Sequence, residues 1–250
     1  MASVDSSGVW SFTSSITRGL SYDRLIPAVG KVYDEDCTMQ ITQYKTNNDG
    51  LVFHHSLRSA TPFDDLGTTA MTYNNVTFTT IDGRYCMYRN GSAWAEGTPN
   101  NQYLYPYGTQ PFTVMCWVYL YNAYNYKRGM CIYGTSESVC TGIDTFGSFR
   151  FSASSAYGST EFYAVTGSLS INTWHHLAYT YDGNRTYRTY YNGALQETTT
   201  KSYDHPTPSG CNMTIGKHPS GVTNGTNYIS DVRLYNRVLT QAEIQEIMAI

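Results

Sequence analysis

The sequence has 250 residues, of which 14% are charged and 15% are aromatic, and its formal net charge is −3. Globular chains usually carry about 25% charged residues, so uncharged polar side chains and tyrosines must cover most of this surface. The 24 tyrosines and the low charge exclude a disordered chain, and the lack of a basic excess excludes a nucleic-acid binder. Because no apolar run reaches about 18 residues, membrane insertion is excluded as well.

The first part of the chain, residues 1–48, differs from the rest because it lacks regular alternation of apolar and polar residues. It is rich in serine, with a turn signal at 26–30 and a short acidic cluster at 34–36. We therefore expect an N-terminal arm or anchor segment without a core of its own. No signal peptide is visible after Met1, which indicates synthesis in the cytoplasm. We accordingly expect the five Asn-x-Ser/Thr triplets to be unmodified and the six cysteines to be free thiols.

From residue 49 onward the pattern changes to short strands separated by turn residues, which is typical of a β-sandwich. The dipeptides Asp82-Gly83 and Asn192-Gly193 mark tight turns, the second suited to a type I′ hairpin. The predicted strands cover residues 51–57, 76–81, 112–120, 146–151, 161–165, 174–181, 213–216 and 228–235.

The segment 112–120 gives the clearest strand. Phe112, Val114, Cys116, Val118 and Leu120 share one face, and apolar residues also occupy the other face. A strand that is apolar on both faces is expected at the centre of a sheet, covered on both sides.

The chain ends in a predicted helix after Thr240, with Glu243 three residues on in a capping box. Leu239 and Ile244 sit where a hydrophobic staple would form, and Ile247 continues the buried stripe.

Four segments, in order, resemble the laminin-G-like, concanavalin A-like jelly-roll superfamily. They are residues 112–118 (FTVMCWV), 174–183 (WHHLAYTYDG), 190–195 (YYNGAL) and 229–240 (ISDVRLYNRVLT). The resemblance covers residues 49–250 and implies an all-β sandwich of two antiparallel sheets with about 14 strands and a short C-terminal helix. It does not settle function, because sugar binders, adhesion modules, glucanases and structural domains share this scaffold.

Catalytic motifs are missing from the sequence. Retaining glucanases on this scaffold carry a Glu-x-Asp-x-x-Glu strand, and none occurs here. The pairs His54-His55 and His175-His176 are adjacent, so in a strand their rings point to opposite faces and cannot chelate one metal. We therefore expect a protein without enzymatic activity.

A structural Ca²⁺ is a further implication of the resemblance. The segment Asp64-Asp65-Leu66-Gly67 resembles an acidic turn that helps to hold calcium in the family, and Asp231 or Asp82 could add oxygen ligands. Leu66 departs from that pattern. The alternative is a turn capped by its own aspartate, together with an Asp231 that pairs with arginine.

Carbohydrate sites need aromatic faces for stacking and amide or hydroxyl groups for hydrogen bonds. Two stretches that we expect to be loops, 94–107 and 121–126, have this composition, whereas Tyr119 and other tyrosines in predicted strands are interpreted as structural. The alternative is that the loop tyrosines cover sheet faces or a neighbouring subunit. The candidate glycan-binding residues are Trp94, Tyr103, Tyr105, Tyr121, Asn122, Tyr124, Asn125 and Tyr126.

Together these features favour a surface protein of a virion, such as a bacteriophage capsid decoration, head fibre or tail adhesin, made in the host cytoplasm. Its sandwich would bind surface glycans, and residues 1–48 would bind other capsid proteins and support an oligomer. A lectin-like module without a viral setting, a purely structural particle protein and a glycan-cleaving enzyme are the alternatives.

Overall fold

The computed structural model describes residues 49–88, 93–97, 109–121, 170–202, 213–216 and 227–250 with their side chains, and elsewhere the backbone of the strands named below. The chain divides into two compact units, Met1–Asp49 and Gly50–Ile250. In the described residues no helix has the length and hydropathy needed to cross a membrane.

The first unit contains a small antiparallel sheet with the strand order β1-β2-β4-β3. Each of its strands has two or three residues, in keeping with the poor alternation of this part of the sequence. The strands are β1 (Ala2–Val4), β2 (Trp10–Phe12), β3 (Val32–Tyr33) and β4 (Met39–Ile41).

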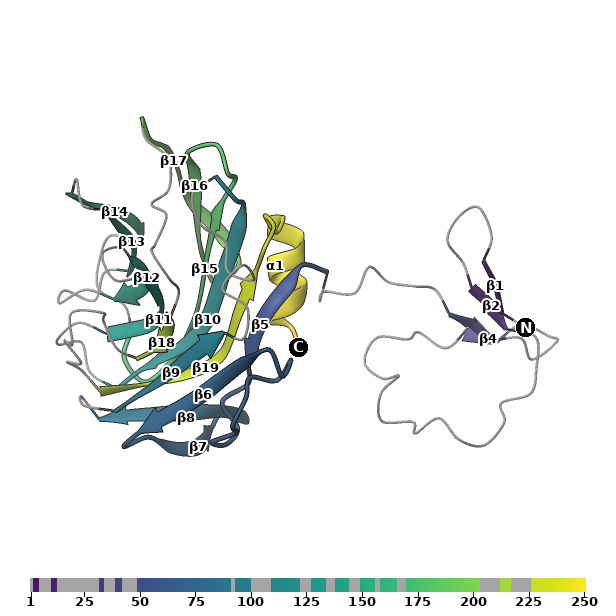
Figure 1. The fold of residues 1–250 in the computed structure, drawn as a ribbon, viewed down its shortest axis with the longest axis horizontal. Helices are drawn as coiled ribbons and strands as arrows, with labels where there is room; N and C mark the ends of the chain where they lie inside the picture. Colours follow the sequence, from purple (N-terminus) through teal and green to yellow (C-terminus); the bar gives the residue numbers. More distant parts are fainter. Residues whose placement is uncertain are drawn as a thin grey trace. The chain divides into compact units, whose positions relative to one another are not determined.

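The second unit is a jelly-roll sandwich of two antiparallel sheets, which confirms the predicted fold class (Figure 1). The eight-stranded sheet has the order β17-β16-β15-β10-β19-β8-β7, with β5 also paired to β19. Its strands are β5 (Leu51–His55), β7 (Thr77–Ile81), β8 (Arg84–Asn90), β10 (Phe112–Leu120), β15 (Trp174–Tyr181), β16 (Thr186–Tyr191), β17 (Ala194–Thr200) and β19 (Thr226–Tyr235).

The seven-stranded sheet has the order β14-β13-β12-β11-β18-β9-β6. It faces the other sheet as the second layer of the sandwich in Figure 1. Its strands are β6 (Thr69–Asn74), β9 (Trp94–Pro99), β11 (Lys127–Tyr133), β12 (Ser138–Ile143), β13 (Phe149–Ser155), β14 (Gly158–Val165) and β18 (Asn212–Ile215).

Strand β10 lies at the centre of the eight-stranded sheet, between β15 and β19, as its sequence predicts. Its residues Val114, Cys116 and Val118 point into the core between the sheets, where they join Met213 and Ile215 of β18. Each of these five side chains is at most 1% exposed. The core between the sheets is therefore built by one face of β10, and the other face is left for a second layer of contacts.

That second layer is formed in part by helix α1 (Gln241–Met248), which lies on the side of the eight-stranded sheet away from the seven-stranded sheet (Figure 1). Ile244 and Ile247 of α1 pack on Met115 and Ala178 of the sheet. The predicted capping box is present, with the Thr240 side chain accepting a hydrogen bond from the Glu243 amide.

The hairpin between β16 and β17 turns at Asn192 and Gly193, whose φ angles are 48° and 74°. Two successive positive φ angles are what a type I′ turn requires, so this prediction is confirmed. The described cysteines Cys86 and Cys116 are buried thiols.

Candidate functional site

The outer face of the eight-stranded sheet carries aromatic side chains beyond the area that α1 covers. The pairing registers place Trp174, Tyr119, Tyr228 and Tyr88 directly opposite one another on β15, β10, β19 and β8. Residues paired in this way project from the same face of a sheet. We call these four residues the aromatic row.

The rings of the aromatic row contact one another in sequence across the sheet. The ring centroids of Trp174 and Tyr119 are 5.4 Å apart, those of Tyr119 and Tyr228 are 5.7 Å apart, and those of Tyr228 and Tyr88 are 4.8 Å apart. All four side chains are half-buried. Since strands are spaced by about 4.8 Å, the row extends for about 14 Å across four strands.

Polar groups line the aromatic row as well. Trp174 donates its Nε1–H to the carbonyl oxygen of Ile81 at 3.3 Å. Within the described part of the chain, the hydroxyls of Tyr88, Tyr119 and Tyr228 form no hydrogen bond. Burial raises the pKa of Tyr228, and its neighbours Tyr88 and Tyr121 raise it further, so the Tyr228 hydroxyl stays protonated at neutral pH and can both donate and accept a hydrogen bond.

Arg84 and Trp117 adjoin the aromatic row on the side that faces α1. The guanidinium carbon of Arg84 lies 4.0 Å from the ring centroid of Trp117 and 5.8 Å from that of Trp174. The Trp117 ring also contacts His176 at 5.0 Å, its cross-strand partner on β15. Burial lowers the pKa of His176 to about 3, so this imidazole is neutral at physiological pH.

A bulge in β19 shapes the sheet beside Trp117. Between Met115 and Trp117 of β10 the register shifts by one residue, and Asp231 has a φ of 49°. An extra residue in one strand bends it and re-aims a side chain. Here the bulge brings the Asp231 carboxylate to the outer face, where it contacts His54 and Arg233.

Asp231 accepts hydrogen bonds from His54 Nε2 and Arg233 Nε, both at 2.8 Å. Burial opposes ionisation, but these two donors prevail and lower the pKa of Asp231 to about 2. The other ring nitrogen of His54 lies 3.5 Å from Asp65. The structure thus brings together two of the predicted calcium ligands, Asp65 and Asp231, with the His54 ring between them.

Asp64, the third of these aspartates, is 4% exposed and caps its own turn. Its carboxylate accepts hydrogen bonds from the backbone amides of Thr68 and Thr69, at 2.7 and 2.8 Å. Asp65 accepts one from the Ser56 amide at 2.8 Å. A capped turn and an arginine-paired Asp231 are therefore both present.

Asp82 lies instead in the tight turn between β7 and β8, with a φ of 50°. In the described residues no three His, Cys, Asp or Glu side chains are grouped so that they could hold a metal ion. The calcium site stays a prediction.

Two of the predicted glycan-binding residues lie within the described residues. Tyr121 follows β10 and is 59% exposed, near enough to Tyr228 to raise its pKa. Trp94 begins β9 of the seven-stranded sheet, paired with Asn74, so its placement in a loop was wrong. The others, Tyr103, Tyr105, Asn122, Tyr124, Asn125 and Tyr126, lie outside the described residues.

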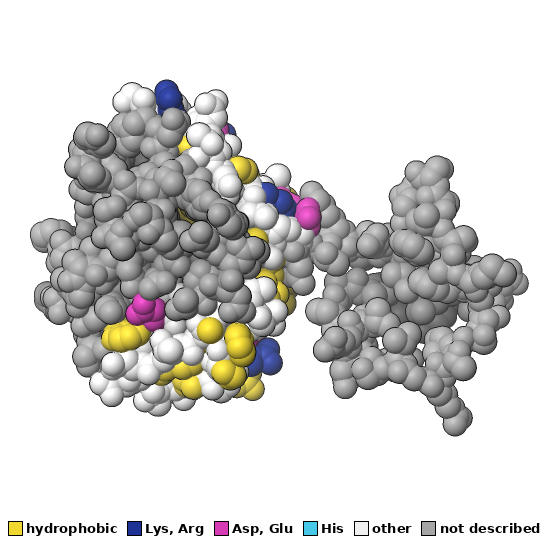
Figure 2. Space-filling model, in the orientation of Figure 1, with side chains coloured by type: hydrophobic (Ala, Val, Ile, Leu, Met, Phe, Trp, Pro, Cys, Tyr) yellow, Lys and Arg dark blue, Asp and Glu magenta, His cyan; other side chains and the backbone are white. Residues whose placement is uncertain are grey.

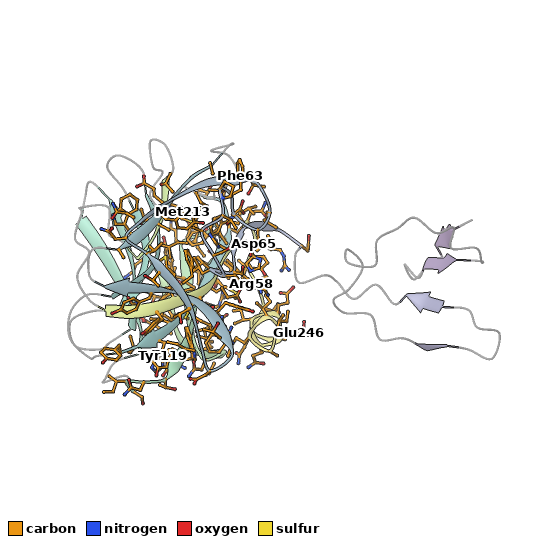
Figure 3. All side chains as sticks on the ribbon, turned by 90° about the horizontal axis from the view of Figure 1, so that it is seen from below. Arg58, Phe63, Asp65, Tyr119, Met213 and Glu246 are labelled. Atoms are coloured by element: carbon orange, nitrogen blue, oxygen red, sulfur yellow. The ribbon has the colours of Figure 1, made fainter. Side chains whose placement is uncertain are left out.

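The sequence interpretation missed the aromatic row, because it treated Tyr119 as structural and did not connect the four strands. Figure 3 shows Tyr119 at one side of the sandwich and Phe63 at the other, so the row and the acidic turn are separate features. The alternation of Trp117 and Tyr119 along β10, continued by Tyr121 just after it, is the signal that could have indicated an aromatic face.

The two antiparallel sheets and their core define a concanavalin A-like β-sandwich. Residues 98–245 match the family model described as the concanavalin A-like lectin/glucanases superfamily. The chain belongs to this superfamily. No curated protein matches the chain.

Solved structures share the fold at low sequence identity. The binding domain of botulinum neurotoxin serotype G superposes with a TM-score of 0.65 at 16% identity, covering 79% of this chain and 50% of that one. The binding domain of botulinum neurotoxin DC, in complex with SialylT, superposes with a TM-score of 0.65 at 16% identity, covering 82% of this chain and 52% of that one. This chain therefore spans about half the length of the neurotoxin structures.

Domain 4 of AbnA matches over nearly its whole length. AbnA is a GH43 extracellular arabinanase from Geobacillus stearothermophilus, and the domain was solved in complex with arabinotriose. The TM-score is 0.62 at 16% identity, and the match covers 79% of this chain and 97% of that domain. At this identity the likeness establishes the fold.

Proposed function

We propose that the sandwich is a carbohydrate-binding domain that works without catalysis. The observation that carries the proposal is the aromatic row, which combines four adjacent ring systems with three tyrosine hydroxyls on one outer face. Sugar rings stack their C–H faces on aromatic side chains, and their hydroxyls need hydrogen-bond partners nearby. Neighbours solved with SialylT or arabinotriose support a glycan as the ligand class.

The absence of catalysis is part of this proposal. Asp64, Asp65 and Asp231 accept hydrogen bonds from backbone amides, His54 or Arg233. Carboxylates engaged in this way hold the fold and are poorly suited to act as the acid and nucleophile of a glycosidase, which need to face one sugar bond. A glycan-cleaving activity of the purified chain would contradict this part of the proposal.

A glycan array with the purified chain tests the binding. Replacing Tyr228 or Tyr88 by alanine is expected to weaken binding about two- to twelve-fold, which corresponds to about 0.5–1.5 kcal/mol for a lost ring contact. Tyr85→Ala is the matched control, because Tyr85 is 49% exposed on the same β8 but outside the aromatic row. Loss of binding in Tyr121→Ala alone would move the site to the loop after β10.

We further propose that this domain belongs to a surface protein of a virion, such as a phage capsid decoration, head fibre or tail adhesin. The unit Met1–Asp49 would attach it to other capsid proteins and support an oligomer, and a compact unit of its own suits that role. The charge-poor surface in Figure 2, where few charged side chains appear among the described residues, suits a densely packed particle. Docking to particles should be lost when residues 1–48 are deleted, and retained docking would contradict the anchor.

A further inference from the structure

Arg84 occupies an unusual place beside the aromatic row. Its guanidinium carbon lies between two indoles, 4.0 Å from the Trp117 centroid and 5.8 Å from the Trp174 centroid. The side chain is half-buried. Burial lowers its pKa, with Arg233 acting in the same direction and Asp231 opposing. The charge is therefore partly desolvated, and no carboxylate of the described residues forms an ion pair with it.

Two other described arginines, one in β19 and one just after it, have carboxylate partners. Arg233 is paired with Asp231 at 2.8 Å, and Arg237 is paired with Glu243 at 2.9 Å. Within the described residues, Arg84 forms neither an ion pair nor a hydrogen bond through its side chain. A guanidinium whose face lies over a ring keeps its in-plane N–H groups available, and that planar fork matches a carboxylate.

The neighbouring groups indicate what kind of molecule would bring the carboxylate. Trp174 contacts both Arg84 and Tyr119, so the cation and the rings form one continuous surface. The Nε1–H of Trp117 is buried and has no hydrogen-bond partner in the described part of the chain. An anionic group attached to a stackable sugar ring fits the cation and the adjoining rings together.

We propose that the aromatic row binds an acidic oligosaccharide, with the Arg84 guanidinium holding the carboxylate of a sugar whose neighbours stack on the aromatic row. This inference rests on the proposed carbohydrate-binding function and adds the ligand class and the residue that selects it. Sialic acid and uronic acid units share this chemistry, so the experiment uses one matched pair of each.

Titration calorimetry with the full chain tests the inference. The probes are sialyllactose against lactose, and trigalacturonate against its methyl ester. At least one acidic probe should bind about ten-fold or more tightly than its neutral twin, and added salt should reduce that preference.

Variants of Arg84 separate its role from folding. Arg84→Gln should abolish the preference for the acidic probe and leave binding of the neutral twin within about two-fold, because the stacking rings remain. Arg84→Lys keeps the charge but lacks the planar fork, so it should retain only part of the preference. Arg58→Gln is the matched control: Arg58 lies 5.1 Å from the Tyr85 ring in the same kind of contact, apart from Tyr119 in Figure 3.

The outcomes distinguish this inference from the function on which it rests. Equal binding of acidic and neutral probes in both pairs would overturn the role of Arg84 and leave the carbohydrate-binding function intact. A preference that survives in Arg84→Gln, with unfolding unchanged, would overturn it as well. If no probe binds and Tyr228→Ala changes no signal on the glycan array, the proposed function itself fails.

Discussion

His176 provides a quantitative test of how the outer face of the eight-stranded sheet is built. Its side chain is 1% exposed, and burial lowers its pKa from an ordinary 6.5 to about 3, with Arg84 and Arg233 acting in the same direction and Asp231 opposing. The unfolded chain binds a proton at His176 near pH 6.5, whereas the folded protein does not. The folded state is therefore fully favoured above pH 6.5 and loses stability as the pH falls toward 3.

The size of this effect follows from the two pKa values. Between about pH 7 and about pH 5, the difference in proton binding removes about 2 kcal/mol from the free energy of unfolding, since each pKa unit is worth about 1.4 kcal/mol. His176→Phe keeps the ring contact with Trp117 and removes the titration. The variant should therefore lose about 2 kcal/mol less than the parent over the same interval.

Urea unfolding at a series of pH values, followed by circular dichroism, measures both slopes. Met115→Leu is a suitable control, because Met115 is buried on the same face of β10 as Trp117 and does not titrate. Met115→Leu should change the free energy of unfolding by a similar amount at every pH. Identical pH slopes for the parent and His176→Phe would refute the burial argument.

Three further substitutions follow from the same geometry. Asp231→Asn leaves the buried Arg233 without its carboxylate and should cost about 3–5 kcal/mol in urea unfolding at neutral pH. In the parent, the contribution of Asp231 to the free energy of unfolding is present above pH 3.8 and should be lost as the pH falls through about 2. Gly183→Ala should destabilise by about 2 kcal/mol or more in the same assay, since Gly183 has a φ of 79° and a Cβ would meet the carbonyl oxygen of Thr109. Thr240→Ala removes the N-cap of α1 and should lower stability by about 1 kcal/mol, whereas Thr240→Ser should be nearly neutral.

Local sequence patterns were sufficient to predict the central strand β10 and the helix α1. β10 has an apolar residue at each alternate position on the core side, and Thr240 with Glu243 forms a capping box within four residues. Asn192-Gly193 identified its hairpin because the turn itself demands positive φ angles. Each of these signals is complete within a short segment, so no knowledge of the rest of the fold is needed.

Peripheral strands were missed because their composition carries no alternation of apolar residues. β17 lies at the edge of the eight-stranded sheet, and none of its residues is buried. β6 is half threonine and asparagine and begins next to the acidic turn. In such strands backbone pairing with a neighbour sets the structure, and that neighbour is distant in the sequence.

The roles of the acidic residues could not be decided from the sequence, for a different reason. The sequence offered two interpretations of Asp64 and Asp231, calcium ligation or local hydrogen bonding, and could not choose between them. The contacts that decide where their oxygens point depend on the bulge at Asp231 and on His54, which lies 177 residues earlier in the chain. A positive φ at a residue other than glycine leaves little trace in a single sequence.

The aromatic row explains why a tyrosine-rich composition is informative only after the registers are known. Tyr179, Tyr181 and Tyr235 are at most 1% exposed and fill the cores, so abundance alone does not mark a binding surface. Tyr119 and Tyr228 are equally ordinary as strand residues, and only the register between β10 and β19 places their rings side by side. A shift of this register by one residue would move the side chains of one strand to the opposite face of the sheet and separate the rings of the row. Because Tyr121 directly follows β10 and lies close to Tyr228, it extends the aromatic row at one end of β10, and Arg84 is the charge beside Trp117 and Trp174.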